Sequence, residues 1–134
     1  MTMQRLKTRE QFQAVLGGLT LARTAHFALH CEVRNCAHLG LAIDQIWMGA
    51  MVPKRWAKRA VTRNLIKRQI YTMANAFEQG LPQGAHVVRL RSGFDRQQFI
   101  SASSEQLKKA VHDEIEQLFK RAIGGAVRSN TVVA

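Results

Sequence analysis

The segment that decides the fold is KRWAKRAVTRNLIKRQIY, which runs from Lys54 to Tyr71. Between Lys54 and Arg68 it carries seven basic side chains and no acidic one. At about 100° per residue, the apolar side chains from here to Phe77 fall on one arc of a helix and the polar ones on the adjoining arc. The segment therefore predicts an amphipathic helix, running to about Phe77, that packs one side on a core and presents a cationic side outward. The apolar arc holds Ile66, Ile70, Met73, Ala74 and Phe77, and the polar arc holds Arg63, Asn64, Lys67, Arg68 and Tyr71.

The cationic side of this helix has two interpretations. A run of charges is often only a solvated helix face, but such faces are stabilised by acidic partners three or four residues away, and this segment has none. Its cations repel one another, and a bound polyanion would remove that repulsion. Asn64 and Tyr71 add hydrogen-bonding and stacking groups. The pattern therefore favours a surface that binds nucleic acid.

Length and charge limit the class of protein. The chain has 134 residues, 46% of them hydrophobic, which suits one folded domain, expected over residues 1–124 with a flexible tail over 125–134. Its formal net charge of +11 points to nucleic acid or an anionic membrane surface as the partner. The longest apolar run, Ile46 to Pro53, is too short to span a bilayer, and no signal peptide is recognisable, so we expect a cytoplasmic protein. Binding to a membrane surface is a weak alternative, because the basic helix has no excess of bulky apolar side chains.

Two further helices are expected. A capping box predicts the first, with Thr8 as the N-cap and Gln11 three residues on. Apolar side chains follow at helical spacing, and the glycines at 17–18 end this helix. A last helix is expected from residue 103 or 104 to about Ile123, where two glycines end it.

The strands are predicted from alternation. Residues 26–33 alternate between a more apolar and a more polar set, which is typical of a half-buried strand and turns Ala28 and His30 away from the core. Strands are also expected over 46–52 and 85–91, and a short strand over 39–43 is left open. The order of elements favours an α+β, two-layer sandwich, with helices laid over one small mixed sheet.

Catalytic and metal-binding motifs are not apparent in this chain. A protein nuclease needs clustered carboxylates for divalent metals or a positioned acid–base pair, and the acids before the last helix are scattered singly. Cys31 and Cys36 lie near His30 and His38, but their spacing matches no common zinc pattern, so we expect reduced thiols. The sequence therefore predicts no catalytic residue and no metal site.

The basic segment contains a motif of known type. Lys54-Arg55 is followed by Lys58-Arg59-Ala60-Val61 and then by Arg63-Asn64-x-x-Lys67-Arg68. This run resembles the signature of the protein subunit of bacterial ribonuclease P, which has a basic pair, an Ala-Val, then Arg-Asn-Arg-x-Lys-Arg and a further Arg. Two positions depart from that pattern: Leu65 replaces the second Arg of the triplet, and Tyr71 replaces the later one.

The resemblance covers most of residues 5–120 in the same order and spacing. It includes Phe27 to His30 in the first predicted strand, Met48 to Val52 before the signature and His86 to Arg89 after it. It implies the α+β sandwich of that family, similar to the second domain of ribosomal protein S5, with a left-handed βαβ crossover. General handedness rules would not have predicted that crossover.

The resemblance also implies a mechanism and partners. In this family a catalytic RNA hydrolyses one phosphodiester and removes the 5′ leader from precursor tRNA, with Mg²⁺ bound mainly by the RNA. The implied partners are therefore the catalytic ribonuclease P RNA and precursor tRNA, with no membrane and no obligate protein partner.

Two sets of binding residues follow from the resemblance. A single-stranded leader suits an aromatic side chain with cationic neighbours, because bases stack while phosphates pair with Lys and Arg. The residues implied for RNA contact are Lys54, Arg55, Lys58, Arg59, Arg63, Asn64, Lys67 and Arg68, and those implied for the leader cleft are Phe12, Leu16, Ala28 and His30.

Two other functions are compatible with a basic domain of this size. One is a non-catalytic RNA-binding protein of another ribonucleoprotein, such as the ribosome. The other is a helix-type DNA-binding regulator, which is disfavoured because no helix-turn-helix spacing or dimerisation segment is visible.

Overall fold

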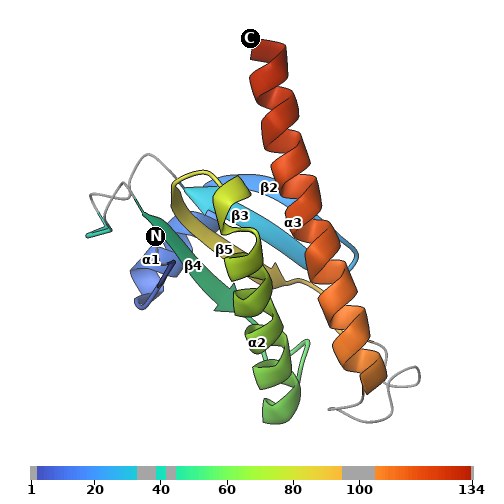
Figure 1. Cartoon of the computed structure of the whole chain (residues 1–134). Coiled ribbons are helices and arrows are strands. Elements are labelled where there is room, and N and C mark those ends of the chain that lie inside the picture. The colour runs from blue at the N-terminus through green and yellow to red at the C-terminus, as the bar shows by residue number, and fades with distance from the viewer. Residues whose placement is uncertain (1–2, 33–38, 42–44, 95–104, 134) are drawn as a thin grey trace.

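The computed structural model describes residues 3–32, 39–41, 45–94 and 105–133, with side chains up to residue 123. Five strands form one mixed sheet in the order β1-β4-β5-β3-β2, and three α-helices and one short 3-10 helix accompany it (Figure 1). The parallel pairs are β1–β4 and β4–β5, and β3 runs antiparallel to both β5 and β2. The elements are β1 (Gln4–Arg5), α1 (Arg9–Leu16), β2 (Leu19–Arg23), β3 (Phe27–Glu32), β4 (Ile46–Met51), α2 (Ala60–Ala76), η1 (Glu78–Gly80), β5 (Gly84–Leu90) and α3 (Glu105–Val133).

The first helix begins and ends where the sequence predicted. The Thr8 side chain accepts from the backbone N–H of Gln11, and the Gln11 side chain accepts from the backbone N–H of Thr8, so the capping box is confirmed. Gly17 caps the C-terminus of α1. Local hydrogen-bond chemistry alone therefore defines this element.

Three of the strands were predicted and two were not. β3, β4 and β5 are confirmed within two residues at each end. β1 is only two residues long, and β2 is an edge strand with no buried residue, so neither has an apolar alternation that a sequence could show. In the region left open as a strand, residues 39–41 are a turn and irregular chain, and 42–44 lie outside the described residues. Cys36, His38 and the expected start of the last helix at residue 103 or 104 also lie outside them.

The basic helix begins later than predicted. Residues 54–59 form a turn and an extended link in which the backbone N–H groups of Trp56 and Ala57 both donate to the Pro53 carbonyl, and α2 begins only at Ala60. Its N-cap, Arg59, makes no side-chain cap hydrogen bond. Because the N-terminal end of a helix is its positive end, four flanking cations and no acid disfavour extending the helix through this segment.

The last helix runs further than predicted. We expected the glycines at 124–125 to end it, but α3 continues to Val133, and its final turns extend beyond the sheet (Figure 1). Glycine costs about 1 kcal/mol relative to alanine inside a helix, which weakens the helix without ending it as proline would. The expected flexibility of residues 125–134 stays a prediction.

The sheet has helices on both faces. α2 and α3 lie side by side on one face, and α1 lies on the other (Figure 1). The larger core lies between the sheet and α2 and α3, and a smaller one lies under α1. The larger core includes Phe27, Leu29, Met48, Ile66, Ile70, Val88, Leu90, Ile115, Leu118 and Phe119, and the smaller one is Leu6, Val15, Leu41, Ala85 and Val87.

The connection from β4 through α2 to β5 is a left-handed crossover between parallel neighbouring strands (Figure 1). This agrees with the handedness that the resemblance implied and is rare among βαβ units. The crossover places the loop at 54–59 and the N-terminus of α2 at the end of the sheet where β4 finishes. Within the described residues, no helix combines the length and apolar character needed to cross a membrane.

Candidate nucleic-acid interface

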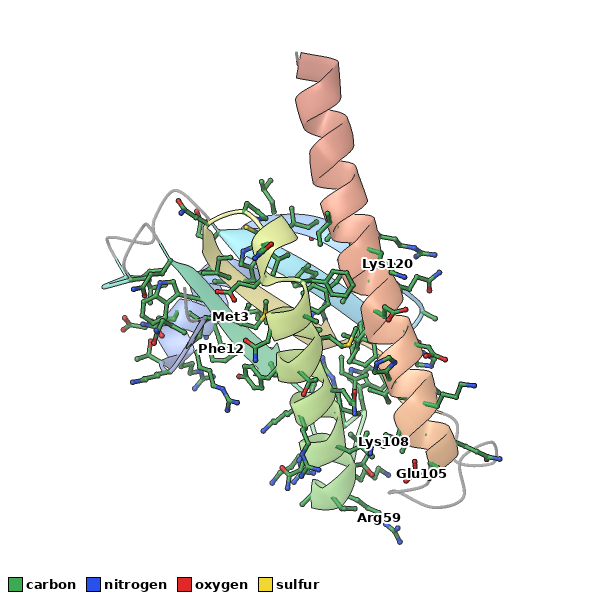
Figure 2. All side chains as sticks on the ribbon, in the orientation of Figure 1. Met3, Phe12, Arg59, Glu105, Lys108 and Lys120 are labelled. Carbon is green, nitrogen blue, oxygen red and sulfur yellow. The ribbon has the colours of Figure 1, made fainter. Side chains whose placement is uncertain are left out.

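The predicted basic residues lie together on one exposed surface. Lys54, Arg55, Lys58 and Arg59 are exposed in the loop before α2, and Asn64, Lys67 and Arg68 are exposed on α2 itself. Figure 2 shows Arg59 at the end of α2, pointing away from the sheet. We call these seven residues the basic surface.

Acidic side chains do not neutralise the basic surface in the part of the chain that the structure describes. The ion pairs found there all involve α3: His26 with Glu114, His112 with Asp113, and Lys120 with Glu116. The paired carboxylates therefore all lie on α3, the helix beside α2, while the cations before and along α2 have no described carboxylate within 4.0 Å. A surface of this kind attracts a polyanion from solution.

The start of α2 adds to the positive potential. Partial positive charge gathers at a helix N-terminus, where backbone N–H groups point outward. The first turn of α2 contains no acidic residue, and Lys58 and Arg59 directly precede it. Together these features favour phosphate oxygens at this end of the helix.

Arg63 differs from the other predicted cations. It is half-buried, and its Nη1 donates to the carbonyl oxygens of Ala57, at 3.0 Å, and Lys58, at 2.9 Å. The guanidinium therefore fixes the extended link before α2 and sets where the neighbouring cations project. Arg63 supports the basic surface structurally, whatever contact it makes with RNA.

The predicted leader residues converge on the opposite face of the sheet, but not all of them are accessible. Phe12 and Leu16 are half-buried on α1, and the Phe12 ring lies against Gly49 of β4, where a Cβ would be 2.5 Å from its Cε1 atom. Ala28 is fully buried and His30 is 6% exposed. The expectation that these two are exposed was wrong, because β3 is an interior strand and α1 packs against the face of the sheet to which they point.

Two arginines that sequence reasoning did not select flank this position. Arg23 of β2 and Arg89 of β5 pair with Ala28 from either side, so both point to the α1 side of the sheet. The alternation of β5 could have identified Arg89 from the sequence, because it places Arg89 on the same side of the sheet as Val87. Phe12, Leu16, Arg23, His30 and Arg89 are the side chains that we call the α1 face.

His30 holds Arg89 in place. The Nε of Arg89 donates to Nε2 of His30 at 3.4 Å, so Nδ1 of His30 carries the proton and donates to the Thr20 hydroxyl at 3.2 Å. Burial, and then the charges of Arg89 and Arg23, lower the pKa of His30 below its usual value. The imidazole is therefore neutral at pH 7 and acts as a hydrogen-bond acceptor for the arginine.

The two departures from the ribonuclease P signature have structural explanations. Leu65 is half-buried and packs against the larger core, where an arginine would have to leave its charge in solvent. Tyr71 is half-buried, and its hydroxyl accepts from the backbone N–H of Ala50 at 3.3 Å. Both replacements attach α2 more closely to the body of the domain.

Among the described residues, no group of three or more His, Cys, Asp or Glu side chains is arranged to hold a metal ion. The cations of the basic surface would also repel a divalent ion. The side chains that the structure describes therefore do not fit a resident Mg²⁺.

Comparisons with known proteins agree with this geometry. The family model described as Ribonuclease P matches residues 1–123. A Bordetella parapertussis ribonuclease P protein component is 35% identical over 117 residues, covering 87% of this chain and 89% of the relative. One from Burkholderia mallei is 32% identical over 127 residues, covering 94% and 87%. The RNase P protein of Staphylococcus aureus shares the fold, with a TM-score of 0.64 at 21% identity over 88% of this chain and 94% of that one. The chain therefore belongs to the ribonuclease P protein family, the protein component of an endoribonuclease whose other component is the ribonuclease P RNA.

Proposed function

We propose that the basic surface binds the phosphate backbone of the ribonuclease P RNA, while the α1 face holds the single-stranded 5′ leader of precursor tRNA. The RNA component then cleaves one phosphodiester and removes the leader. The observation that carries this proposal is the set of six exposed cations around the start of α2, none of which has a carboxylate partner among the described residues. Neutralising phosphates would release counterions and remove the mutual repulsion of these side chains.

The α1 face offers groups for both parts of a nucleotide. The half-buried Phe12 ring has an exposed portion on which a base can stack, and stacking contributes about 1–3 kcal/mol per base. Arg23 is exposed and Arg89 half-buried, and both can pair with leader phosphates. Recognition through stacking and phosphate pairing does not depend on base identity, which suits an enzyme that processes many precursors.

Mg²⁺ bound by the RNA supplies the activation of the attacking water. The residues of this chain have a different task, which is to bring two polyanions together. Cations between the RNA and the leader reduce phosphate repulsion and so lower the concentration of free Mg²⁺ needed for association. Because both RNA partners are made and matured in the bacterial cytoplasm, we expect the protein to act there.

Reconstitution tests the proposal. The purified protein is mixed with a bacterial ribonuclease P RNA and a precursor tRNA, and 5′ processing is followed as Mg²⁺ is lowered. We expect cleavage at Mg²⁺ concentrations where the RNA alone is inactive. No gain over the RNA alone would overturn the proposal and favour an RNA-binding role in another ribonucleoprotein.

A competition experiment tests leader binding by the α1 face separately from RNA binding by the basic surface. Precursors with leaders of different lengths are compared with mature tRNA as competitors for the holoenzyme. The α1 face predicts that affinity rises with leader length and then levels off. Equal affinity for mature tRNA and for long-leader precursor would remove the leader-binding part of the proposal and leave the RNA-binding part intact.

A further inference from the structure

Arg5 and Tyr71 meet across two elements that are far apart in the sequence. The guanidinium carbon of Arg5, at the end of β1, lies 3.9 Å from the centroid of the Tyr71 ring on α2. Arg5 is exposed and Tyr71 is half-buried. A cation–π contact of this kind uses the face of the ring and leaves the N–H groups of the guanidinium available to other acceptors.

The pairing of β1 decides the direction of Arg5. Arg5 is the register partner of Met48, which is buried in the core on the α2 side. Leu6 is buried in the smaller core under α1, so alternation along the chain turns Arg5 toward α2. Met3, two residues earlier, packs against the same larger core and is labelled beside α2 in Figure 2. The sheet itself therefore aims Arg5 at the helix.

The Tyr71 ring is also held in place at its hydroxyl group. Its hydroxyl accepts from the backbone N–H of Ala50 in β4 at 3.3 Å. β4 pairs with β5 through Ala50 and Val88, but β1 pairs with β4 only as far as Met48, apart from one further bond from the N–H of Leu6 to the Met48 carbonyl. The Tyr71 hydroxyl therefore takes the place of a β1 partner for the N–H of Ala50. A ring fixed in this way presents a constant platform for Arg5.

The location of this contact continues the basic surface. Tyr71 lies one turn after Lys67 and two turns after Asn64, so all three fall within about 60° of one another around α2. After Arg68 the helix contributes no further cation of its own. Arg5 therefore supplies positive charge where α2 lacks it, and no described carboxylate forms an ion pair with it.

We propose that Arg5 extends the RNA-binding surface along α2 as a phosphate ligand, and that Tyr71 is its positioning residue. This inference rests on the proposed function, because it assigns a further contact to the same RNA partner. The ring restricts a flexible side chain, so less conformational entropy is lost when the guanidinium binds a phosphate. Tyr71 thus contributes to RNA binding by positioning the charged guanidinium of Arg5, which belongs to β1.

The test compares variants of the full chain for binding to a ribonuclease P RNA over a range of salt concentrations. Arg5→Gln should weaken binding about tenfold at low salt and reduce the slope of log K against log salt by about 1. Tyr71→Leu should weaken binding through Arg5, so adding it to Arg5→Gln should cause little further loss. Tyr71→Arg combined with Arg5→Gln places a guanidinium on α2 itself and should restore the salt slope.

Two controls keep the outcomes separate. Lys67→Gln removes a cation from the basic surface, and Lys120→Gln removes one from α3. If Arg5→Gln leaves affinity and slope unchanged while Lys67→Gln lowers both, the role of Arg5 is overturned and the proposed function stands. If neither variant differs from Lys120→Gln, the proposed RNA surface itself is wrong. A loss of affinity in Arg5→Gln that comes with a large fall in Tm and no change in slope would show a structural role instead, and would also overturn the inference.

Discussion

Glu114 on α3 binds His26 twice, through both its backbone and its side chain. Oε2 accepts from the His26 backbone N–H at 2.6 Å, and Oε1 lies 2.7 Å from Nδ1 of the imidazole. The same carboxylate accepts from the Thr24 hydroxyl at 2.6 Å, and the His26 ring stacks on Phe94 at 4.0 Å between centroids. One side chain thus attaches α3 to the turn between β2 and β3.

Loss of that carboxylate should destabilise the domain without affecting RNA contacts. Glu114 is 14% exposed, so Glu114→Ala leaves three polar groups without their acceptor and should cost about 2–3 kcal/mol. For a chain of this size that corresponds to a fall in Tm of roughly 10 °C. Glu116→Ala breaks only the exposed pair with Lys120 and should change stability by less than about 0.5 kcal/mol. Equal Tm values for the two variants would contradict the assignment.

His86 should make the domain less stable in acid. It is fully buried, its Nε2 donates to the Pro82 carbonyl at 2.8 Å, and its Nδ1 is the one buried side-chain polar atom without a partner in the described residues. Burial lowers the pKa of His86 below the usual 6.5. Between the folded pKa and 6.5 the unfolded chain binds more protons, so stability is retained above about pH 6.5 and falls as the pH drops toward the folded pKa.

The measurement for His86 is chemical denaturation at pH 5 and pH 7. The wild-type protein should have a lower free energy of unfolding at pH 5, and His86→Phe should show a smaller difference between the two pH values. His30 has a lowered pKa for similar reasons and contributes in the same direction, so the difference in free energy of unfolding between pH 5 and pH 7 should become smaller in His86→Phe but should not disappear. An unchanged difference in this variant would mean that other groups cause the pH dependence.

Arg63 should affect the shape of the basic surface as well as its charge. Arg63→Ala removes both hydrogen bonds to the Ala57 and Lys58 carbonyls, so the loop at 54–59 should exchange its amide hydrogens faster and RNA affinity should fall. Lys67→Ala removes one exposed cation and should lower affinity without changing exchange in the loop. Hydrogen exchange and RNA binding on the two variants, and on the double variant, check this. The domain should remain folded in all three.

Phe12 should contribute to leader binding through its ring. Phe12→Leu keeps apolar volume against Gly49 but removes the aromatic face, and should weaken holoenzyme binding of precursor tRNA by about 1–3 kcal/mol. Binding of mature tRNA should not change, because it has no leader. Gly49→Ala should act in the same direction, since a Cβ there would displace the ring. A similar loss for mature tRNA would indicate that Phe12 acts through the fold.

The sequence predicted those features that depend on neighbouring residues. The capping box at Thr8, the position of strand β3 and the cations before and along α2, which form no ion pair among the described residues, follow from local patterns with direct physical causes, and each is present in the structure. The motif at Lys54 to Arg68 also identified the family correctly. It placed the start of α2 six residues too early, because apolar periodicity does not register how strongly cations disfavour a helix N-terminus.

Only the tertiary structure decided which side chains are accessible and which act together. Alternation predicted that Ala28 and His30 point away from the core, but β3 is an interior strand, and whether both of its faces are buried depends on the elements that pack against them, such as α1. The pairings of Arg89 with His30 and of Arg5 with Tyr71 join residues from different elements, so no local pattern could show them. Sheet register fixes those contacts, and register is a property of the assembled strands, since a shift of one residue would send each side chain to the other face.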